Sequence, residues 1–175
     1  MYQSFYDSPL GKLLLQSDGE NLTALKIQNH RFYHEYEKDS MIQKDDLEIF
    51  KETRDWLDRY FRKEKPGIKE LPLKPQGTEF RERVWRILCE IPYGTVITYG
   101  DIARRIAKED GIEKMSAQAV GGAVGHNPIG IIIPCHRVIG QNGKLTGYGG
   151  GIENKIKLLE LEEVDQGKWR RDEFC

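Results

Sequence analysis

Cysteine is scarce in this chain of 175 residues, and its placement argues against two common classes of protein. The three cysteines, Cys89, Cys135 and Cys175, are an odd number at wide spacings, which argues against a disulfide framework and fits a reducing compartment. No CxxC pair or Cys/His cluster has the spacing of a zinc site. We therefore expect neither a disulfide scaffold nor a metal centre.

Long apolar runs are also missing. No apolar stretch approaches the ~20 residues that a membrane span requires. Residues 1–7 lack the basic start and the apolar block of a signal peptide. The content of 38% hydrophobic and 31% charged residues is that of an ordinary folded protein. We therefore expect a cytoplasmic protein that does not bind membranes.

A strong excess of charge of either sign is absent as well. The net charge of −1 gives no indication of an anionic partner. Residues 76–151 nevertheless contain nine Lys/Arg against seven Asp/Glu, whereas the remainder contains 18 basic and 21 acidic residues. This weak asymmetry permits nucleic-acid binding by the second half without requiring it.

The first part of the chain has the pattern of a small sheet. Residues that favour strands recur in segments 2–7, 12–16 and 22–27, and turn signals separate these segments. The pattern predicts an antiparallel meander. Residues 29–44 are polar and without periodicity, and they are predicted to form a loop.

A helix and a link follow this sheet. Residues 45–62 carry apolar side chains at helical spacing, which predicts a helix whose apolar face packs on the sheet. Residues 63–75 are interrupted by prolines and are predicted to link two domains. The predicted division is an N-terminal domain of residues 1–75 and a C-terminal domain of residues 76–175.

Capping residues divide the second half into short helices. Thr78 can cap a helix that runs to about residue 90. Residues 98–101 form a capping box that opens a helix through about residue 108, and Ser116 can cap a helix over residues 117–124. The last two helices resemble a helix-turn-helix, although the same pattern is typical of two packed helices without a DNA role.

The last of these helices has unusually small side chains. Ala117, Ala119 and Gly121 leave Gln118 as its one side chain suited to reading base edges. Small residues allow a close approach to a sugar-phosphate wall or to the minor groove. They suit close packing between helices equally well.

A cysteine follows directly after an apolar run. Residues 129–133 are predicted to form a buried strand that Pro134 ends, which presents Cys135 beside His136. A cysteine next to a group that can hold a proton is typical of a nucleophilic thiolate. The alternative is that Cys135 is a small buried apolar residue, as most free cysteines are.

The remaining segments surround this motif. Residues 141–144 are a strong tight-hairpin signal and predict a wing. Residues 147–151 are glycine-rich, which fits either a pocket wall that contacts a flat ligand or a tolerant loop. Residues 152–163 are predicted to form a closing helix, and residues 168–175 a loose tail.

The motif Pro134-Cys135-His136-Arg137-Val138, with Asn127-Pro128 before it and residues 147–151 after it, resembles the O6-alkylguanine-DNA alkyltransferases. These proteins are also called methylated-DNA–protein-cysteine methyltransferases. The resemblance covers about residues 78–163, with the motifs in the family's order and at its spacing. It implies a mixed α/β (α+β) fold. The N-terminal half would be a ribonuclease-H-like antiparallel sheet with a helix, and the C-terminal half a helical, winged helix-turn-helix-like domain that carries the active site.

The resemblance also implies a function in DNA repair. Such a protein flips O6-alkylguanine, mainly O6-methylguanine, out of duplex DNA and transfers the alkyl group irreversibly and stoichiometrically to its cysteine. The expected partner is double-stranded DNA that contains the lesion, bound by a monomer without a metal or other cofactor. Because a thioether product is stable, each molecule would act once.

The resemblance assigns catalytic roles to five residues of this sequence. Cys135 matches the alkyl acceptor, and His136 matches the histidine that takes its proton through a bound water. Glu162 matches the glutamate that orients this histidine. Asn127 matches the asparagine that ties the helix-turn-helix to the active-site loop, and Tyr99 the tyrosine implicated in base flipping and in protonating the departing guanine.

It further assigns contacts to the base and the DNA. The set comprises Tyr148 and Gly149 in the pocket loop, Ala117, Gln118, Ala119 and Gly121 on the recognition helix, and Arg137 and Val138 in the motif. Gln118 departs from the family, because many members place an arginine finger there that fills the gap left by the flipped base. Glutamine can fill space and hydrogen-bond, but it brings no charge.

Two other functions compete with this one. A Cys–His hydrolase is disfavoured because Cys135 and His136 are adjacent, and neighbouring side chains on an extended chain point to opposite faces. A non-catalytic helix-turn-helix regulator or alkylated-base-binding protein would tolerate Cys135→Ser, whereas a transferase would lose all activity.

Overall fold

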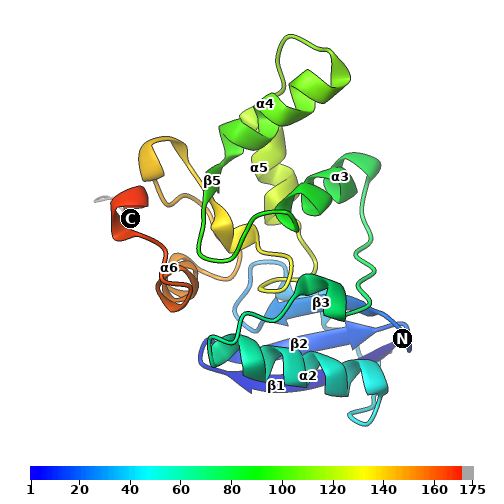
Figure 1. The fold of residues 1–175 in the computed structure, drawn as a ribbon. Coiled ribbons are helices and arrows are strands. Elements are labelled where there is room, and N and C mark those ends of the chain that lie inside the picture. The colour runs from blue at the N-terminus through cyan, green and yellow to red at the C-terminus, as the bar shows by residue number, and fades with distance from the viewer. Residues whose placement is uncertain (171–175) are drawn as a thin grey trace.

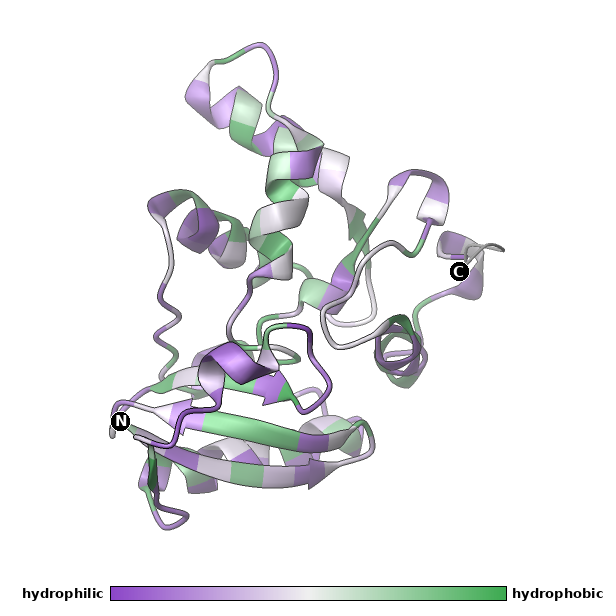
Figure 2. Cartoon of the chain, turned by 180° about the vertical axis from the view of Figure 1, so that it is seen from behind, coloured by the Kyte–Doolittle hydropathy of each residue, from purple (hydrophilic) through white to green (hydrophobic). Residues whose placement is uncertain are grey.

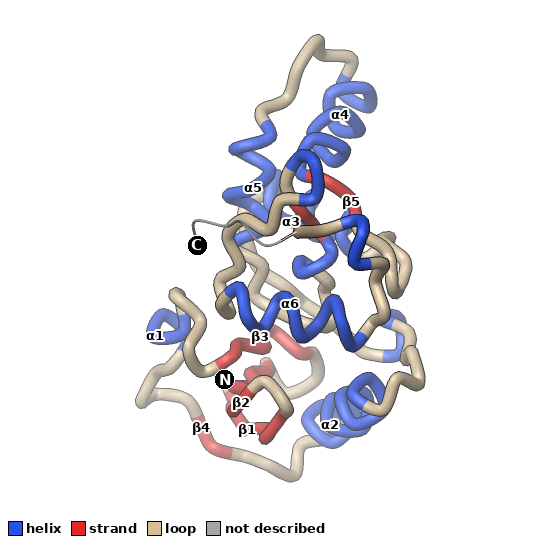
Figure 3. The backbone as a smooth tube through the Cα atoms, turned by 90° about the vertical axis from the view of Figure 1, so that its left-hand side faces the viewer, coloured by secondary structure: helices blue, strands red, loops and turns tan. Residues whose placement is uncertain are grey.

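The computed structural model describes residues 1–170, so Cys175 and the end of the predicted tail lie outside the described residues. The protein has a mixed α/β architecture, with an N-terminal sheet and a helical C-terminal half above it (Figure 1). Helix α2 (Glu48–Phe61) covers one face of the sheet, and the C-terminal half lies along the edge formed by β3 (Leu22–Ile27) (Figure 3). Among the described residues, no helix is both long enough and apolar enough to cross a membrane.

The predicted meander is confirmed. Strands β1 (Tyr2–Ser8), β2 (Gly11–Ser17) and β3 (Leu22–Ile27) pair antiparallel in the order β3-β2-β1. The predicted loop that follows is partly wrong. It contains the single-turn helix α1 (Tyr33–Tyr36) and the two-residue strand β4 (Ile42–Gln43), which pairs parallel with β1. Elements this short leave no period in a sequence, because periodicity needs several turns or alternations.

Helix α2 (Glu48–Phe61) begins three residues later than its spacing predicts. The side chain of Asp45 accepts hydrogen bonds from Ser4 (2.5 Å) and Gln43 (2.7 Å), so it fastens the chain to the sheet instead of capping the helix. The apolar face of α2 is buried as expected, with Phe50 and Leu57 fully enclosed against the strands.

The predicted link, residues 63–75, is attached to the free edge of β3. Leu22 donates its amide to the carbonyl of Pro72 (2.9 Å), and the amide of Lys74 donates to the carbonyl of Leu22 (2.9 Å). Residues from both halves also share one apolar core. The division into domains 1–75 and 76–175 therefore stays a prediction.

The predicted helix starts of the second half are confirmed at atomic detail. Helix α3 (Glu79–Leu88) is capped by Thr78, whose hydroxyl accepts from the amide of Arg81 (3.2 Å). Helix α4 (Tyr99–Asp110) opens with a reciprocal capping box between Thr98 and Asp101. Such caps satisfy amides that have no partner within the helix.

Helix α5 (Ala117–Gly125) completes the helix-turn-helix pair with α4. The hydroxyl of Ser116 accepts from the amide of Ala119 (3.1 Å), so its cap also forms as predicted. Seen from behind, α5 is mostly white to green, because its residues are small or apolar (Figure 2).

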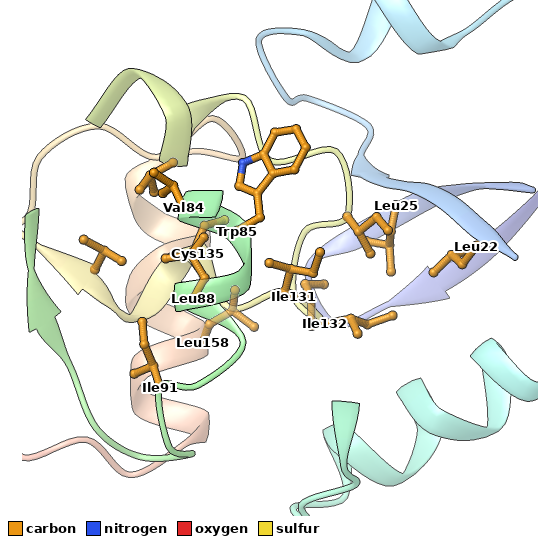
Figure 4. Packing of buried hydrophobic residues seen from close by; sticks show 14 of the residues in the cluster. Leu22, Leu25, Val84, Trp85, Leu88, Ile91, Ile131, Ile132, Cys135 and Leu158 are labelled. Atoms are coloured by element: carbon orange, nitrogen blue, oxygen red, sulfur yellow. The ribbon is translucent and has the colours of Figure 1, made fainter. Parts of the chain in front are cut away.

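The predicted buried strand over residues 129–133 is wrong. Only Ile129 bridges to the sheet, and the chain then turns back on itself. The amide of Ile132 donates to the carbonyl of Gly130 (2.7 Å), and Ile131 has φ 68°, a left-handed conformation that β-branched residues rarely adopt. The isoleucines are buried as a strand's would be, but they anchor a tight loop. Figure 4 shows Ile131 and Ile132 between Leu25 of β3 and Leu88 of α3.

The predicted wing is only half right. The chain turns over Gln141–Gly143, and the amide of Gly140 donates to the carbonyl of Lys144 (2.7 Å). However, β6 (Val138–Ile139) pairs parallel with β5 (Ile97–Thr98) and not across this turn. The chain after the turn pairs instead with Arg170. The amide of Leu145 donates to the carbonyl of Arg170 (3.1 Å), and the amide of Arg170 donates to the carbonyl of Gly143 (2.7 Å).

The C-terminal part closes the structure. Helix α6 (Ile152–Leu161) forms as predicted and buries Ile156, Leu158 and Leu159. The start of the predicted loose tail is ordered, since Trp169 packs against a second apolar cluster around Leu159.

Candidate active site

Cys135 is the first residue of a short 3-10 helix, Cys135–Arg137, that follows the turn of isoleucines. Its side chain is buried, 9% exposed, and it faces a small pocket. The pocket is lined from both halves of the chain, by Leu25, Lys26, Ile27, His30, Val124, Gly125, Asn127, Gly130, Cys135, Gly147, Tyr148 and Gly149. The thiol is thus presented by a loop and a helical turn, not by the end of a strand.

Asn127 holds this loop in place. Its side-chain amide donates to the carbonyls of Ile133 (2.8 Å) and Ile129 (3.3 Å), and its carbonyl oxygen accepts from the amide of Ile129 (3.0 Å). Asn127 lines the same pocket as Cys135 and lowers the pKa of its thiol. Because Asn127 follows α5 directly, it ties the helix-turn-helix to the cysteine.

His136 is fully buried behind the pocket. Its Nε2 lies 2.5 Å from Oε2 of Glu162. Its Nδ1 is buried and has no hydrogen-bond partner among protein atoms of the described residues. A neutral imidazole that donates from Nε2 keeps a lone pair on Nδ1, so His136 can accept a proton there.

Glu162 is the first residue after α6 and is 2% exposed. Its carboxylate accepts hydrogen bonds from Nε of Arg137 (2.7 Å), the hydroxyl of Tyr60 (2.6 Å) and the amide of Gly94 (3.1 Å), in addition to His136. The guanidinium of Arg137 neutralises its charge, which a buried carboxylate requires.

These contacts fix the protonation states behind the pocket. Burial alone would raise the pKa of Glu162, but the neighbouring His136 and Arg137 and their hydrogen bonds lower this pKa far below its usual range. Burial lowers the pKa of His136, and this effect exceeds the opposing influence of the Glu162 carboxylate. Glu162 is therefore ionised and His136 neutral at pH 7.

The thiol itself experiences opposing influences. Burial has the larger effect and raises the pKa of Cys135, whereas Asn127 and the ammonium groups of Lys26 and Lys155 partly oppose this shift. Tyr148 lines the same pocket as the thiol. The thiol is therefore protonated at rest, and the nearby positive charge stabilises the thiolate once the proton has left.

The glycine-rich loop covers the pocket closely. The carbonyl of Gly149 accepts from the amide of Arg31 (3.0 Å) in the N-terminal half. A side chain at position 149 would meet the ring of His30 at 2.1 Å, so only glycine fits there. The loop is therefore a built pocket wall and not merely a segment that tolerates glycine.

Tyr99 is the first residue of α4 and lies beside α5, close to Gly121. Its hydroxyl donates to the carbonyl of Thr146 (3.3 Å), and burial raises its pKa to about 12. Tyr99 therefore stays protonated at neutral pH and can act as a proton donor.

A wider groove runs beside the pocket along α4 and α5. The predicted contact residues Ala117, Gln118 and Gly121 line it together with Tyr99. Ala119 is exposed on α5 but does not line this groove. The sequence did not indicate Arg31, which reaches the same groove from the N-terminal half.

Arg137 and Val138 stay predicted contacts to the base or the DNA, and the side chains of both are buried. Arg137 is 6% exposed because its guanidinium points inward to Glu162 and to the carbonyl of Ile91 (2.7 Å). Val138 is fully buried in β6. Both side chains support the site from behind.

The comparisons with known proteins agree with this geometry. Residues 79–164 match the DNA binding domain of 6-O-methylguanine DNA methyltransferase, and residues 1–75 match its ribonuclease-like domain. The chain belongs to the 6-O-methylguanine DNA methyltransferase family. The expected fold class and family are thereby confirmed.

Relatives of this alkyltransferase span nearly its whole length. The methylated-DNA–protein-cysteine methyltransferase of Haemophilus influenzae is 42% identical over 94% of this chain and 87% of its own. That of Mycobacterium tuberculosis H37Rv is 45% identical over 90% and 89%. The crystal structure of M. tuberculosis OGT in complex with DNA superposes with a TM-score of 0.77 at 40% identity and covers 93% of each chain.

The alkyltransferase site disfavours the hydrolase alternative on geometry as well. His136 directs Nε2 to Glu162 and does not line the pocket, whereas the thiol lines it with Asn127 and Tyr148. The sequence did not single out Lys26, Lys155 or Tyr60. The one available signal for Lys26 was its position inside an otherwise apolar strand segment.

Replacing the buried carboxylate should destabilise the alkyltransferase strongly. We expect Glu162→Gln to lower the free energy of unfolding at pH 7 by about 3–5 kcal/mol, because it leaves the buried guanidinium of Arg137 without a counter-charge. Urea denaturation measures this loss. Glu160→Gln removes an exposed carboxylate of α6 and is the matched control, with an expected change within about 0.5 kcal/mol.

The same variant should change the acid dependence of stability. In the folded state the pKa of Glu162 lies below its ordinary value of 4.5. The ionised carboxylate therefore contributes fully to the free energy of unfolding above pH 4.5, and this contribution is lost as the pH falls below 4.5. The loss of stability between neutral pH and acid should therefore be smaller in Glu162→Gln than in the native protein. An equal pH dependence in both proteins would contradict the assigned ionisation of Glu162.

Proposed function

We propose that this alkyltransferase repairs O6-alkylguanine, mainly O6-methylguanine, in double-stranded DNA by transferring the alkyl group irreversibly to Cys135. The observation that carries the proposal is a buried thiol that lines a pocket, with the hydrogen-bonded pair of His136 and Glu162 next to it in the fold. Curated relatives with this activity at 42–45% identity support the same reaction class.

The reaction proposed is a displacement at the alkyl carbon. His136 accepts the thiol proton at Nδ1 through a bridging water, as the family resemblance implies. The thiolate sulfur then forms a bond to the methyl carbon while the bond from that carbon to O6 breaks. The electron pair remains on the guanine, which Tyr99 neutralises by donating its phenol proton.

The base must leave the duplex to reach the thiol. We propose that the nucleotide is flipped into the pocket at a cost of a few kcal/mol, and that Tyr148 and Gly149 cover it there. Tyr148, Gly149 and Cys135 line the same pocket, so a base bound there would lie beside the thiol.

The surface for DNA is the groove along α5. Its small residues, with Gln118 among them, suit a close approach to the minor groove. The unit proposed to bind is a monomer. We also propose that it acts in the cytoplasm, where free thiols such as Cys89 and Cys135 stay reduced.

The stoichiometry of transfer tests the proposed function. After mixing with duplex DNA that contains one O6-methylguanine, intact mass should rise by one methylene group per chain and then saturate. The gain should map to the peptide that contains Cys135, because a thioether is stable and nothing returns the sulfur to its free state.

Two cysteine variants sharpen this experiment. Cys135→Ser should show no mass gain, whereas Cys89→Ser should gain mass as the native protein does. Tight, lesion-selective binding without a mass gain in the native protein would indicate a non-catalytic lesion-binding protein. Neither binding nor transfer would contradict the proposal altogether.

Gln118 stands where many members of the family have an arginine, and this difference gives a second prediction. Gln118→Arg adds a positive charge in the groove, so duplex affinity should rise and its dependence on salt should steepen by about one unit of log K per log salt. Fluorescence anisotropy over a salt series measures both. Gln43→Arg adds the same charge on β4, the sheet edge farthest from the groove, and should leave the slope unchanged.

A further inference from the structure

Lys26 is a buried lysine that reaches the active site from the sheet. It lies on β3, is 2% exposed, and donates from Nζ to the backbone carbonyl of Asn127 (2.6 Å). Its neighbour Leu25 exchanges backbone hydrogen bonds with Pro128 (2.9 Å) and Gly130 (3.0 Å). The edge of β3 is thus fastened to the segment before the cysteine, and Lys26 lines the same pocket as Cys135.

Two buried lysines near the pocket have no carboxylate partner among the described residues. Lys155 on α6 is the second buried lysine, fully enclosed, and it donates from Nζ to the carbonyl of Val138 (2.6 Å). Neither lysine forms an ion pair with a carboxylate among residues 1–170. No carboxylate is found among the described side chains that line the pocket. The buried carboxylate behind it, Glu162, is already matched by Arg137.

Other titratable groups near Lys26 come from the segment after β3. Glu35, an exposed carboxylate, favours the charged form of Lys26, while Arg31 opposes it. Burial lowers the pKa of His30 to about 4, so its ring is neutral at pH 7. The ring of Tyr36 lies 4.7 Å from Nζ and adds a favourable cation–π contact.

We propose that Lys26 is a positioning residue for alkyl transfer, whose buried ammonium acts through Cys135 by stabilising the thiolate that forms when His136 takes the thiol proton. This inference rests on the proposed function and extends the chemistry to the N-terminal sheet. A buried ammonium favours a nearby anion, and the thiol of Cys135 lines the same pocket and can become that anion by giving up its proton.

The protonation of Lys26 fits this role. Burial lowers its pKa to about 8, and the adjacent thiol opposes that shift. Lys26 is therefore still mostly protonated at pH 7, where the thiolate is needed. Above pH 8 the lysine loses its charge, and its support of the thiolate disappears.

The test is the pH profile of Cys135 alkylation by iodoacetamide, a neutral electrophile that needs no DNA. Lys26→Gln keeps a donor for Asn127 but removes the charge, and Lys26→Arg keeps both. We expect Lys26→Gln to move the midpoint of the profile up by about one pH unit and to slow alkylation about tenfold at pH 7. Lys26→Arg should stay close to the native profile.

Lys12→Gln removes an exposed charge from the neighbouring strand β2 and is the matched control. Peptide mass spectrometry separates Cys135 from the other cysteines, and circular dichroism confirms folding of each variant. If Lys26→Gln titrates as the native protein does, or if Lys26→Arg shifts equally, Lys26 is merely structural and the proposal is wrong.

A second measurement uses the native chain, so it does not depend on a variant that folds. When iodoacetamide has converted Cys135 to a neutral thioether, Lys26 loses the group that can become its anion and its pKa should fall, as followed by NMR of the lysine side chain. An unchanged pKa would overturn the inference. Methyl transfer from lesion-containing DNA is measured separately, so a failure of the repair function is distinguishable from a failure of this electrostatic role.

Discussion

The buried carboxylate of Glu162 is the interaction on which the rest of the structure depends. It accepts hydrogen bonds from Tyr60 on α2, from Gly94 after α3, and from His136 and Arg137 beside the cysteine. A charge removed from water must be matched in place, so these segments cannot separate without a large cost. One side chain thereby joins the N-terminal helix to the active-site turn and also sets the tautomer of the histidine.

The N-terminal half is consequently part of the active site. The edge of β3 pairs with the segment from Pro128 to Gly130, which places the turn before Cys135, and Lys26 brings a charge to the pocket from the same strand. On the opposite side, Arg31 holds the carbonyl of Gly149. The pocket therefore forms where the two halves of the chain meet, with the thiol between a sheet edge and the helix-turn-helix.

Local signals in the sequence were sufficient for much of this fold. Helix caps such as Thr98 and Ser116 were readable because their partners lie three residues away. The run of isoleucines was wrongly predicted to be a strand, because an apolar run is buried in a strand and in a buried loop alike. The loop is held by the side chain of Asn127, which donates a hydrogen bond to the carbonyl of Ile133. The motif identified the cysteine and its histidine. It could not show that Arg137 turns inward, because its partner Glu162 is distant in the sequence.

The central claim is that burial keeps His136 neutral, while Glu162 fixes its proton on Nε2 and leaves a free lone pair on Nδ1. Nitrogen-15 NMR of the imidazole ring measures this directly in the unmodified protein. The account predicts one protonated and one unprotonated ring nitrogen at pH 7, and the protonated nitrogen should be Nε2, which faces Glu162. Two protonated nitrogens at pH 7 would show an imidazolium that cannot accept the thiol proton, and would contradict the account.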